Sequence, residues 1–116
     1  MKLAITRWSG EHAPLQSNLV DALKAEGLVA YVEDSEPSCR FEAHQHPNDE
    51  VLVVVSGELT FGVGDKEWVL KAGDRLDLPA ETPHWAACDV AVRTLSVSRG
   101  DKFDPLRAHH TEENRA

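Results

Sequence analysis

Two short stretches of the sequence hold the residues best suited to chemistry: one contains His44, His46 and Glu50, and the other contains His84. A single residue separates His44 from His46, so on a β-strand both imidazoles point to the same face. Nitrogen ligands suit zinc, iron, nickel and copper, and a carboxylate oxygen also admits manganese. An ion that can bind more ligands than these four side chains has open coordination positions for water, dioxygen or a chelating substrate. The four residues therefore predict one divalent metal site with Lewis-acid or redox chemistry, and they leave the metal open.

The segments that must position these residues are typical of short strands separated by turns. Runs with β-type patterning occupy residues 29–32, 41–46, 51–55, 59–63, 68–70, 75–78, 85–88 and 90–97. A further run at 2–8 predicts an edge strand, which another subunit could pair. Leucines at helical spacing within 14–26 predict one amphipathic helix. The whole pattern favours an all-β sandwich or barrel with one short N-terminal α-helix.

The spacing of the candidate ligands also matches a known family. The pattern HxHxxxExxxxxxG is met by His44, His46, Glu50 and Gly57, and GxxxxxPxxxxH is met by Gly73, Pro79 and His84. Together they resemble the two motifs of the cupin superfamily, over residues 28–98. The resemblance implies an RmlC-like jelly-roll β-barrel, often dimeric, with the metal inside. We therefore expect one cupin domain over residues 1–104 and a polar, flexible tail over 105–116.

Three positions depart from the family pattern. Ser38 and Glu81 stand where glycines are expected, and Cys88 stands where an asparagine ends the second motif. None of the three is a predicted ligand, so the departures bear on turn geometry and pocket chemistry. We expect Cys88 to be a packed small side chain, because nothing in the sequence lowers the pKa of its thiol. Glu81 is expected as a solvated turn carboxylate, with a place at the pocket mouth as the alternative.

Arg40 and Glu42 are the candidate catalytic residues. Strand parity places them on the side of His44 and His46, provided that no bulge intervenes. Arg40 could then hold a substrate carboxylate. The alternative is an ion pair between Arg40 and Glu42, or an outward position of Arg40 beyond a bulge.

The site supports two classes of function. The first is a metal-dependent enzyme, dioxygenase-like, that acts on a small organic substrate. The second is a non-catalytic module in which the metal helps to bind or sense a small molecule. A roomy polar pocket beside the metal would favour the first.

Composition limits the partners. A net charge of -8, with scattered basic residues, disfavours nucleic acid. The longest apolar run, residues 51–55, is far too short to span a bilayer. Cys39 and Cys88 form no CxxC pair, which indicates a reducing cytoplasm, with a single disulfide as the alternative. We therefore predict a cytoplasmic protein that binds a small molecule and neither nucleic acid nor membrane, and the family resemblance implies a homodimer.

Overall fold

The computed structural model describes residues 2–106. Its elements are β1 (Ala4–Thr6), α1 (Gln16–Ala25), β2 (Tyr31–Ser35), β3 (Arg40–His44), β4 (Glu50–Ser56), β5 (Glu58–Val63), β6 (Lys66–Lys71), β7 (Arg75–Leu78), β8 (His84–Ala87) and β9 (Val92–Ser98). The predicted helix and short strands are thus present, with boundaries shifted by a few residues. The all-β class with one short N-terminal helix is confirmed.

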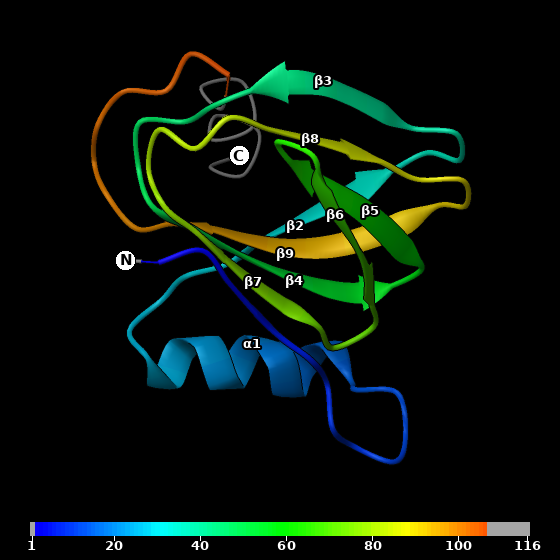
Figure 1. Ribbon diagram of the computed structural model, residues 1–116. Helices are drawn as coiled ribbons and strands as arrows, with labels where there is room; N and C mark the ends of the chain where they lie inside the picture. The colour runs from blue at the N-terminus through cyan, green and yellow to red at the C-terminus, as the bar shows by residue number, and fades with distance from the viewer. Residues whose placement is uncertain (1, 107–116) are drawn as a thin grey trace.

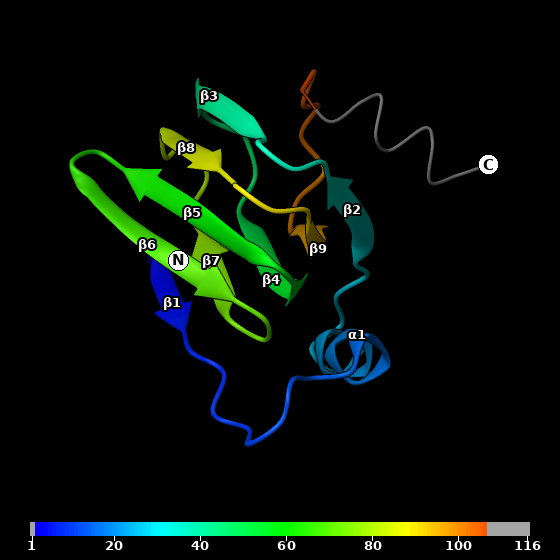
Figure 2. The same cartoon turned by 90° about the vertical axis from the view of Figure 1, so that its right-hand side faces the viewer.

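The strands form two antiparallel sheets that face each other (Figures 1 and 2). One has five strands in the order β1-β7-β4-β9-β2, and the other has four in the order β3-β8-β5-β6. The predicted edge strand is β1, which pairs with β7 of the same chain and ends the five-stranded sheet. Closure of the two sheets into a continuous jelly-roll barrel stays a prediction.

Strand β4 lies at the centre of the five-stranded sheet and is packed on both faces. Val51 and Val53 face the helix, where they join Leu19 and Leu23 of α1 in one apolar cluster. Glu50 and the other alternate residues of β4 face the opposite sheet instead. The apolar run in the sequence is therefore a strand covered by α1 on one side and by the pocket on the other.

An ion-pair network fastens the end of α1 to the sheet. Arg75 of β7 donates hydrogen bonds to the carboxylates of Glu26, just past α1, and of Asp77. The hydrogen bond from Arg75 lowers the pKa of Glu26, and the two carboxylates raise the pKa of Arg75. The contact holds α1 against the outer face, as Figure 1 shows, and leaves the inner face open for the pocket.

The three departures from the family pattern have structural counterparts. Ser38 and Glu81 are the only non-glycine residues of the described range with positive φ, at 61° and 62°. This is the left-handed region, which glycine adopts without strain. Ser38 and Glu81 thus adopt the left-handed backbone conformation that would account for a glycine at these two positions of the family pattern.

Cys88 is bonded to Cys39 in a disulfide, with the two Cα atoms 5.0 Å apart. Its side chain is buried, as expected, but it is a bridged cysteine rather than a simple packed one. The bridge links the residue before β3 to the residue after β8. The single-disulfide alternative is thus the observed one, and the cysteines no longer support a reducing cytoplasm.

The ends of the described range bear on two further expectations. Of the predicted tail 105–116, only Pro105 and Leu106 are described, and the remainder lies outside the described residues. No helix among the described residues is long and apolar enough to cross a membrane.

Candidate metal site and its pocket

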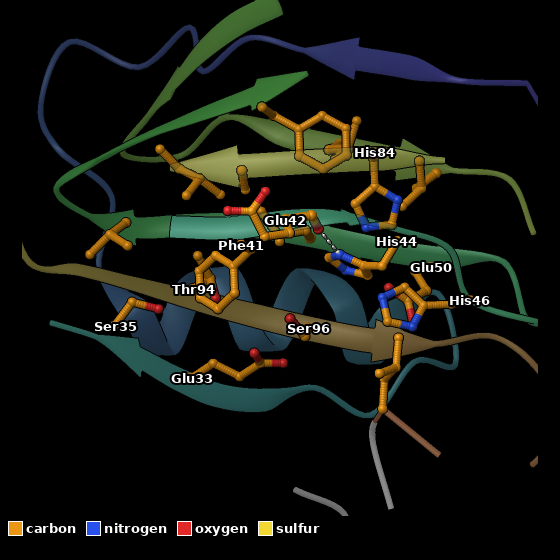
Figure 3. Close-up of a pocket in the computed structure, with 18 of the residues that line it drawn as sticks. Glu33, Ser35, Phe41, Glu42, His44, His46, Glu50, His84, Thr94 and Ser96 are labelled. Carbon is orange, nitrogen blue, oxygen red and sulfur yellow. Dashed lines mark hydrogen bonds and ion pairs between the residues drawn. The ribbon is translucent and has the colours of Figure 1, made fainter. Parts of the chain in front are cut away.

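Three histidines converge at one end of the space between the sheets (Figure 3). His44 ends β3, His84 begins β8, and the two are paired residues of adjacent strands. Their ring centroids lie 4.3 Å apart, and the ring of His46 lies 4.9 and 5.3 Å from those of His44 and His84. His46 is two residues past the end of β3, so the strand itself positions only His44. Each ring places one nitrogen within 4.8 Å of a nitrogen of each of the other two rings, close enough for all three to bind one ion.

The Nδ1 atoms of two of these rings face backbone carbonyls. His44 Nδ1 lies 2.6 Å from the carbonyl oxygen of Glu42, and His84 Nδ1 lies 2.8 Å from that of Thr82. A carbonyl oxygen only accepts hydrogen bonds, so each Nδ1 must carry the proton. Each Nε2 then keeps its lone pair, which is the state that a metal ion requires.

The third ring is held by a carboxylate that the sequence reasoning missed. His46 Nδ1 lies 2.6 Å from Asp104 Oδ2, and both side chains are buried. Asp104 belongs to the segment that follows β9, 58 residues further along the chain. Nothing in its local sequence signals this role. A carboxylate at Nδ1 fixes the ring orientation and makes Nε2 a stronger ligand.

Hydrogen bonds hold the segment that carries Asp104 in place. The Asn48 side chain donates to the carbonyl oxygen of Lys102 at 2.9 Å and accepts from the Lys102 N–H at 3.2 Å. The Arg99 N–H donates to the carbonyl of Asp49 at 2.7 Å. Both anchors lie in the loop between His46 and β4, so the loop and the C-terminal segment position His46 together.

Glu50, the fourth predicted ligand, adjoins the histidines at the start of β4. Its side chain is buried, and its Oε2 atom lies 3.9 Å from His46 Nδ1. The carboxylate of Glu50 forms a second cluster with His46 and Asp104, in which the possible ligand atoms also lie within 4.8 Å of one another. His46 belongs to both this cluster and the three-histidine cluster. The structure thus brings the three imidazoles together and places Glu50 beside one of them. Neutral imidazoles with a carboxylate at their side are a donor set that fits a divalent transition metal.

The four residues line one end of a pocket of about 560 Å³. The four-stranded sheet contributes apolar side chains to it, among them Leu59, Phe61 and Ala86. The five-stranded sheet contributes a set of polar side chains, here called the polar wall: Glu33 and Ser35 of β2 and Thr94 and Ser96 of β9. Figure 3 shows the polar wall running away from the histidines. The alternating pattern of β9 contained the two hydroxyls, but the sequence reasoning assigned them no role.

The parity expected for β3 does not hold, because the strand is irregular. Arg40 pairs with Ala87 and Phe41 with Ala86, and the register with β8 then shifts before His44 pairs with His84. An extra residue of this kind reverses which side chains share a face. Phe41 therefore shares the inner face with His84, and Arg40 borders the pocket from the opposite face. The alternative of an outward Arg40 beyond a bulge agrees with this register.

Glu42 lies within the irregular stretch of β3. Its side chain is exposed and borders the pocket, and its backbone carbonyl holds His44. Glu81, the other candidate for the mouth of the pocket, is also exposed. It is not one of the described residues that line the pocket. It accepts a hydrogen bond from Gln45 at 2.6 Å, and its backbone N–H donates to the carbonyl of His46 at 2.7 Å. Glu81 thus supports the turn around the histidines.

A family model for the cupin domain matches residues 31–98, more than half of the chain. The chain belongs to the cupin family. Acireductone dioxygenase 1 from Pectobacterium atrosepticum is 38% identical to this cupin over 68 residues, which are 51% of this chain and 39% of the dioxygenase. The chain thus spans about two fifths of the length of that relative.

Two solved structures are also similar to this cupin. The DMSP lyase DddQ from Ruegeria pomeroyi is 32% identical, with a TM-score of 0.58 that covers 64% of this cupin and 39% of the lyase. An RmlC-like cupin from Shewanella frigidimarina is 26% identical, with a TM-score of 0.57 that covers 65% and 68% of the two chains. The resemblance identified from the motifs is therefore confirmed.

Proposed function

We propose that this cupin is a metal-dependent enzyme, dioxygenase-like, that acts on a small organic substrate. The observation that carries the proposal is the orientation of the three histidines. Each Nδ1 faces an oxygen acceptor, so each ring offers its Nε2 to a common ion at the wall of the pocket. The similarity to a protein named acireductone dioxygenase supports an oxidoreductase.

The side chains have distinct roles in this proposal. His44, His46 and His84, with Glu50 beside them, would hold one divalent ion, for which iron, manganese, nickel, copper and zinc remain the candidates. A bound ion of this kind supplies Lewis-acid or redox chemistry at its open positions. Asp104 keeps a proton at Nδ1 of His46 and fixes that ring. Phe61 stacks against His84, with ring centroids 5.2 Å apart, and helps to exclude water from this end of the pocket.

The pocket supports a metal ion that meets a small molecule, as it would in this enzyme and also in the alternative, a non-catalytic metal-containing module that binds or senses a small molecule. An ion that only stiffens the fold needs no adjoining space. Here about 560 Å³ adjoins the histidines, within the usual range for small-molecule sites. Glu42 at the rim is the remaining candidate for proton transfer, and Arg40 is a candidate for substrate contact only at the rim.

We retain three further expectations as parts of this proposal. The small molecule is the direct partner, with neither nucleic acid nor membrane involved. The assembly is a homodimer, as the family resemblance implies. The location is the cytoplasm, an expectation that Cys39 and Cys88 do not support because they form a disulfide.

Elemental analysis of untagged protein tests the proposal first. We expect about one equivalent of a redox metal in the native protein, lost in His44→Ala and kept in His12→Ala, which lies outside the site. Loaded protein should then consume dioxygen with an acireductone or with members of a panel of small chelating enediols and catechols. Absence of metal in the native protein contradicts the metal site. A full metal complement without dioxygen uptake, but with tight binding of a panel member, favours the binding module.

A further inference from the structure

The polar wall lies at positions where a core would be expected. Glu33 of β2 pairs with Thr94 of β9, and Ser96 of β9 pairs with Leu52 of β4, so the wall crosses the inner face of the five-stranded sheet. Neighbouring inner positions on β4 and β7 are leucines. Apart from Glu50 at the histidine end, the polar side chains that line the pocket from this sheet are therefore confined to β2 and β9.

The hydroxyl of Ser96 has the least favourable surroundings in this set. Ser96 is 1% exposed, and its Oγ atom has no hydrogen-bond partner among residues 2–106. Burial of a hydroxyl costs free energy unless a hydrogen bond compensates for it. An alanine would fit the same backbone without that cost. The atom lies on the wall of the pocket, where a ligand can supply the missing partner (Figure 3).

Acidic side chains dominate the charge that faces the pocket. Glu33 lies on the polar wall, Glu50 at the histidine end and Glu42 at the rim. Arg40, the one arginine or lysine among those that line the pocket in the described range, lies on the outer face of β3. This distribution disfavours an anionic group deep in the pocket and favours a hydroxyl or an ammonium group.

We propose that the polar wall is a recognition subsite for the non-anionic polar end of the substrate. This inference rests on the proposed function, in which the chelating end of the same molecule lies at the histidines. Ser96 and Thr94 would exchange hydrogen bonds with a hydroxyl or ammonium group, and Glu33 would accept from it. The apolar side chains of Leu59 and Phe61 would cover the carbon skeleton between the two ends. The substrate class is thus a small chelating molecule with a neutral or cationic tail.

Four catechols test the inference, because they share one chelating head and differ in their tails. The set is catechol itself and its 4-(2-aminoethyl), 4-(2-hydroxyethyl) and 4-carboxymethyl derivatives. Calorimetry measures their affinity for zinc-loaded protein, and ¹⁵N NMR titration measures it for metal-free protein. We expect the amine to bind at least about tenfold more tightly than the carboxylate in both forms. In the NMR titration, the largest shifts should fall on Glu33, Thr94 and Ser96.

Two variants with matched controls assign the effect to the wall. Glu33→Gln should reduce the preference for amine over carboxylate to about twofold or less, and Ser96→Ala should weaken the hydroxyethyl compound about fivefold. The exposed replacements Glu58→Gln and Ser17→Ala should change neither value. Zinc content should remain at the native level in both wall variants.

The outcomes separate this inference from the proposed function. Equal binding of the amine and the carboxylate in both forms overturns the inference, as does a preference that survives Glu33→Gln. The chelation part of the proposed function fails if catechol binds no more tightly to zinc-loaded than to metal-free protein. The metal-free titration still decides the role of the wall in that case, because the tails do not need the ion.

Discussion

The two ends of the pocket are built differently. At the histidine end each ring has an oxygen acceptor at its Nδ1, and those acceptors belong to Glu42, Thr82 and Asp104. At the polar wall the buried hydroxyl of Ser96 has no such partner within the described chain. One end is thus fixed before any ligand arrives, and the other leaves a hydrogen bond to be made. Metal sites need the first kind of order, and substrate recognition uses the second.

The strands that carry the histidines and those that carry the polar wall also differ in their backbones. Ser38 and Glu81, with their left-handed conformations, lie in the loops that lead into β3 and β8, the strands of His44 and His84. The Cys39–Cys88 disulfide ties these same strands together. Strands β2 and β9, which form the polar wall, have neither feature among the described residues. Strain and cross-linking are therefore features of the strand pair that carries His44 and His84, with Glu81 near these ligands and with Ser38 and the disulfide at the remote end of the pair.

Removal of a histidine should give the largest effect. His84→Ala should weaken metal binding by more than about 10- to 100-fold, which is the loss typical when a residue that hydrogen-bonds to a metal ligand is removed. Thr94→Val, on the polar wall, should leave metal affinity unchanged. Competition with a chromophoric chelator measures both affinities, and circular dichroism checks that each variant is folded. Equal metal loss in the two variants would remove the distinction between the two ends.

Breaking the disulfide frees the strand pair β3–β8 at the end remote from His44 and His84, without touching a ligand. The double variant Cys39→Ser, Cys88→Ser should lower the free energy of unfolding by about 2 to 4 kcal/mol, as is typical for a bridge that closes a long loop. Urea denaturation measures this loss, and native protein in reductant should show the same value. Hydrogen exchange should accelerate in β3 and β8 more than in β2 and β9. Uniform acceleration over all four strands would contradict a local role.

Variants of Asp104 test whether the carboxylate that holds His46 affects metal affinity. Asp104→Ala should reduce metal affinity about 10- to 100-fold, because the Nδ1 of His46 loses its acceptor. Asp104→Asn keeps an oxygen that can accept the Nδ1 proton, so it should recover part of the affinity. Chelator competition gives these values, and the melting temperature of the metal-free variants shows any purely structural loss. Identical affinities for the two variants would argue against a positioning role.

Local patterns were sufficient to predict much of the site. The spacing of His44, His46 and Glu50 and the second motif around His84 match a known pattern, and they identified residues that do lie together once β3 pairs with β8. Alternating apolar residues predicted most strands. The helix followed from leucines at helical spacing, which pack against Val51 and Val53. These features depend on contacts close in sequence or on one repeated pattern.

Other features depend on pairings that no local pattern encodes. The register shift in β3 arises where it pairs with β8, and it decides that Phe41 rather than Arg40 shares the face of His84. Asp104 reaches His46 across 58 residues, and Cys39 reaches Cys88 across 49. The sequence displays each of these residues, but their partners are set by the arrangement of the two sheets.

The smallest predicted effect changes sign between the loop that leads into β3 and strand β2 of the polar wall. Ser38→Gly should raise the free energy of unfolding by about 0.5 to 1 kcal/mol, because glycine removes the strain of a φ of 61°. The matched change Ser35→Gly, on strand β2 of the polar wall, should lower it by a similar amount, because glycine loses more entropy when a strand forms. Urea denaturation of metal-free protein compares the two. Stabilisation by both glycines, or by neither, would show that the positive φ of Ser38 does not set it apart from a regular strand position.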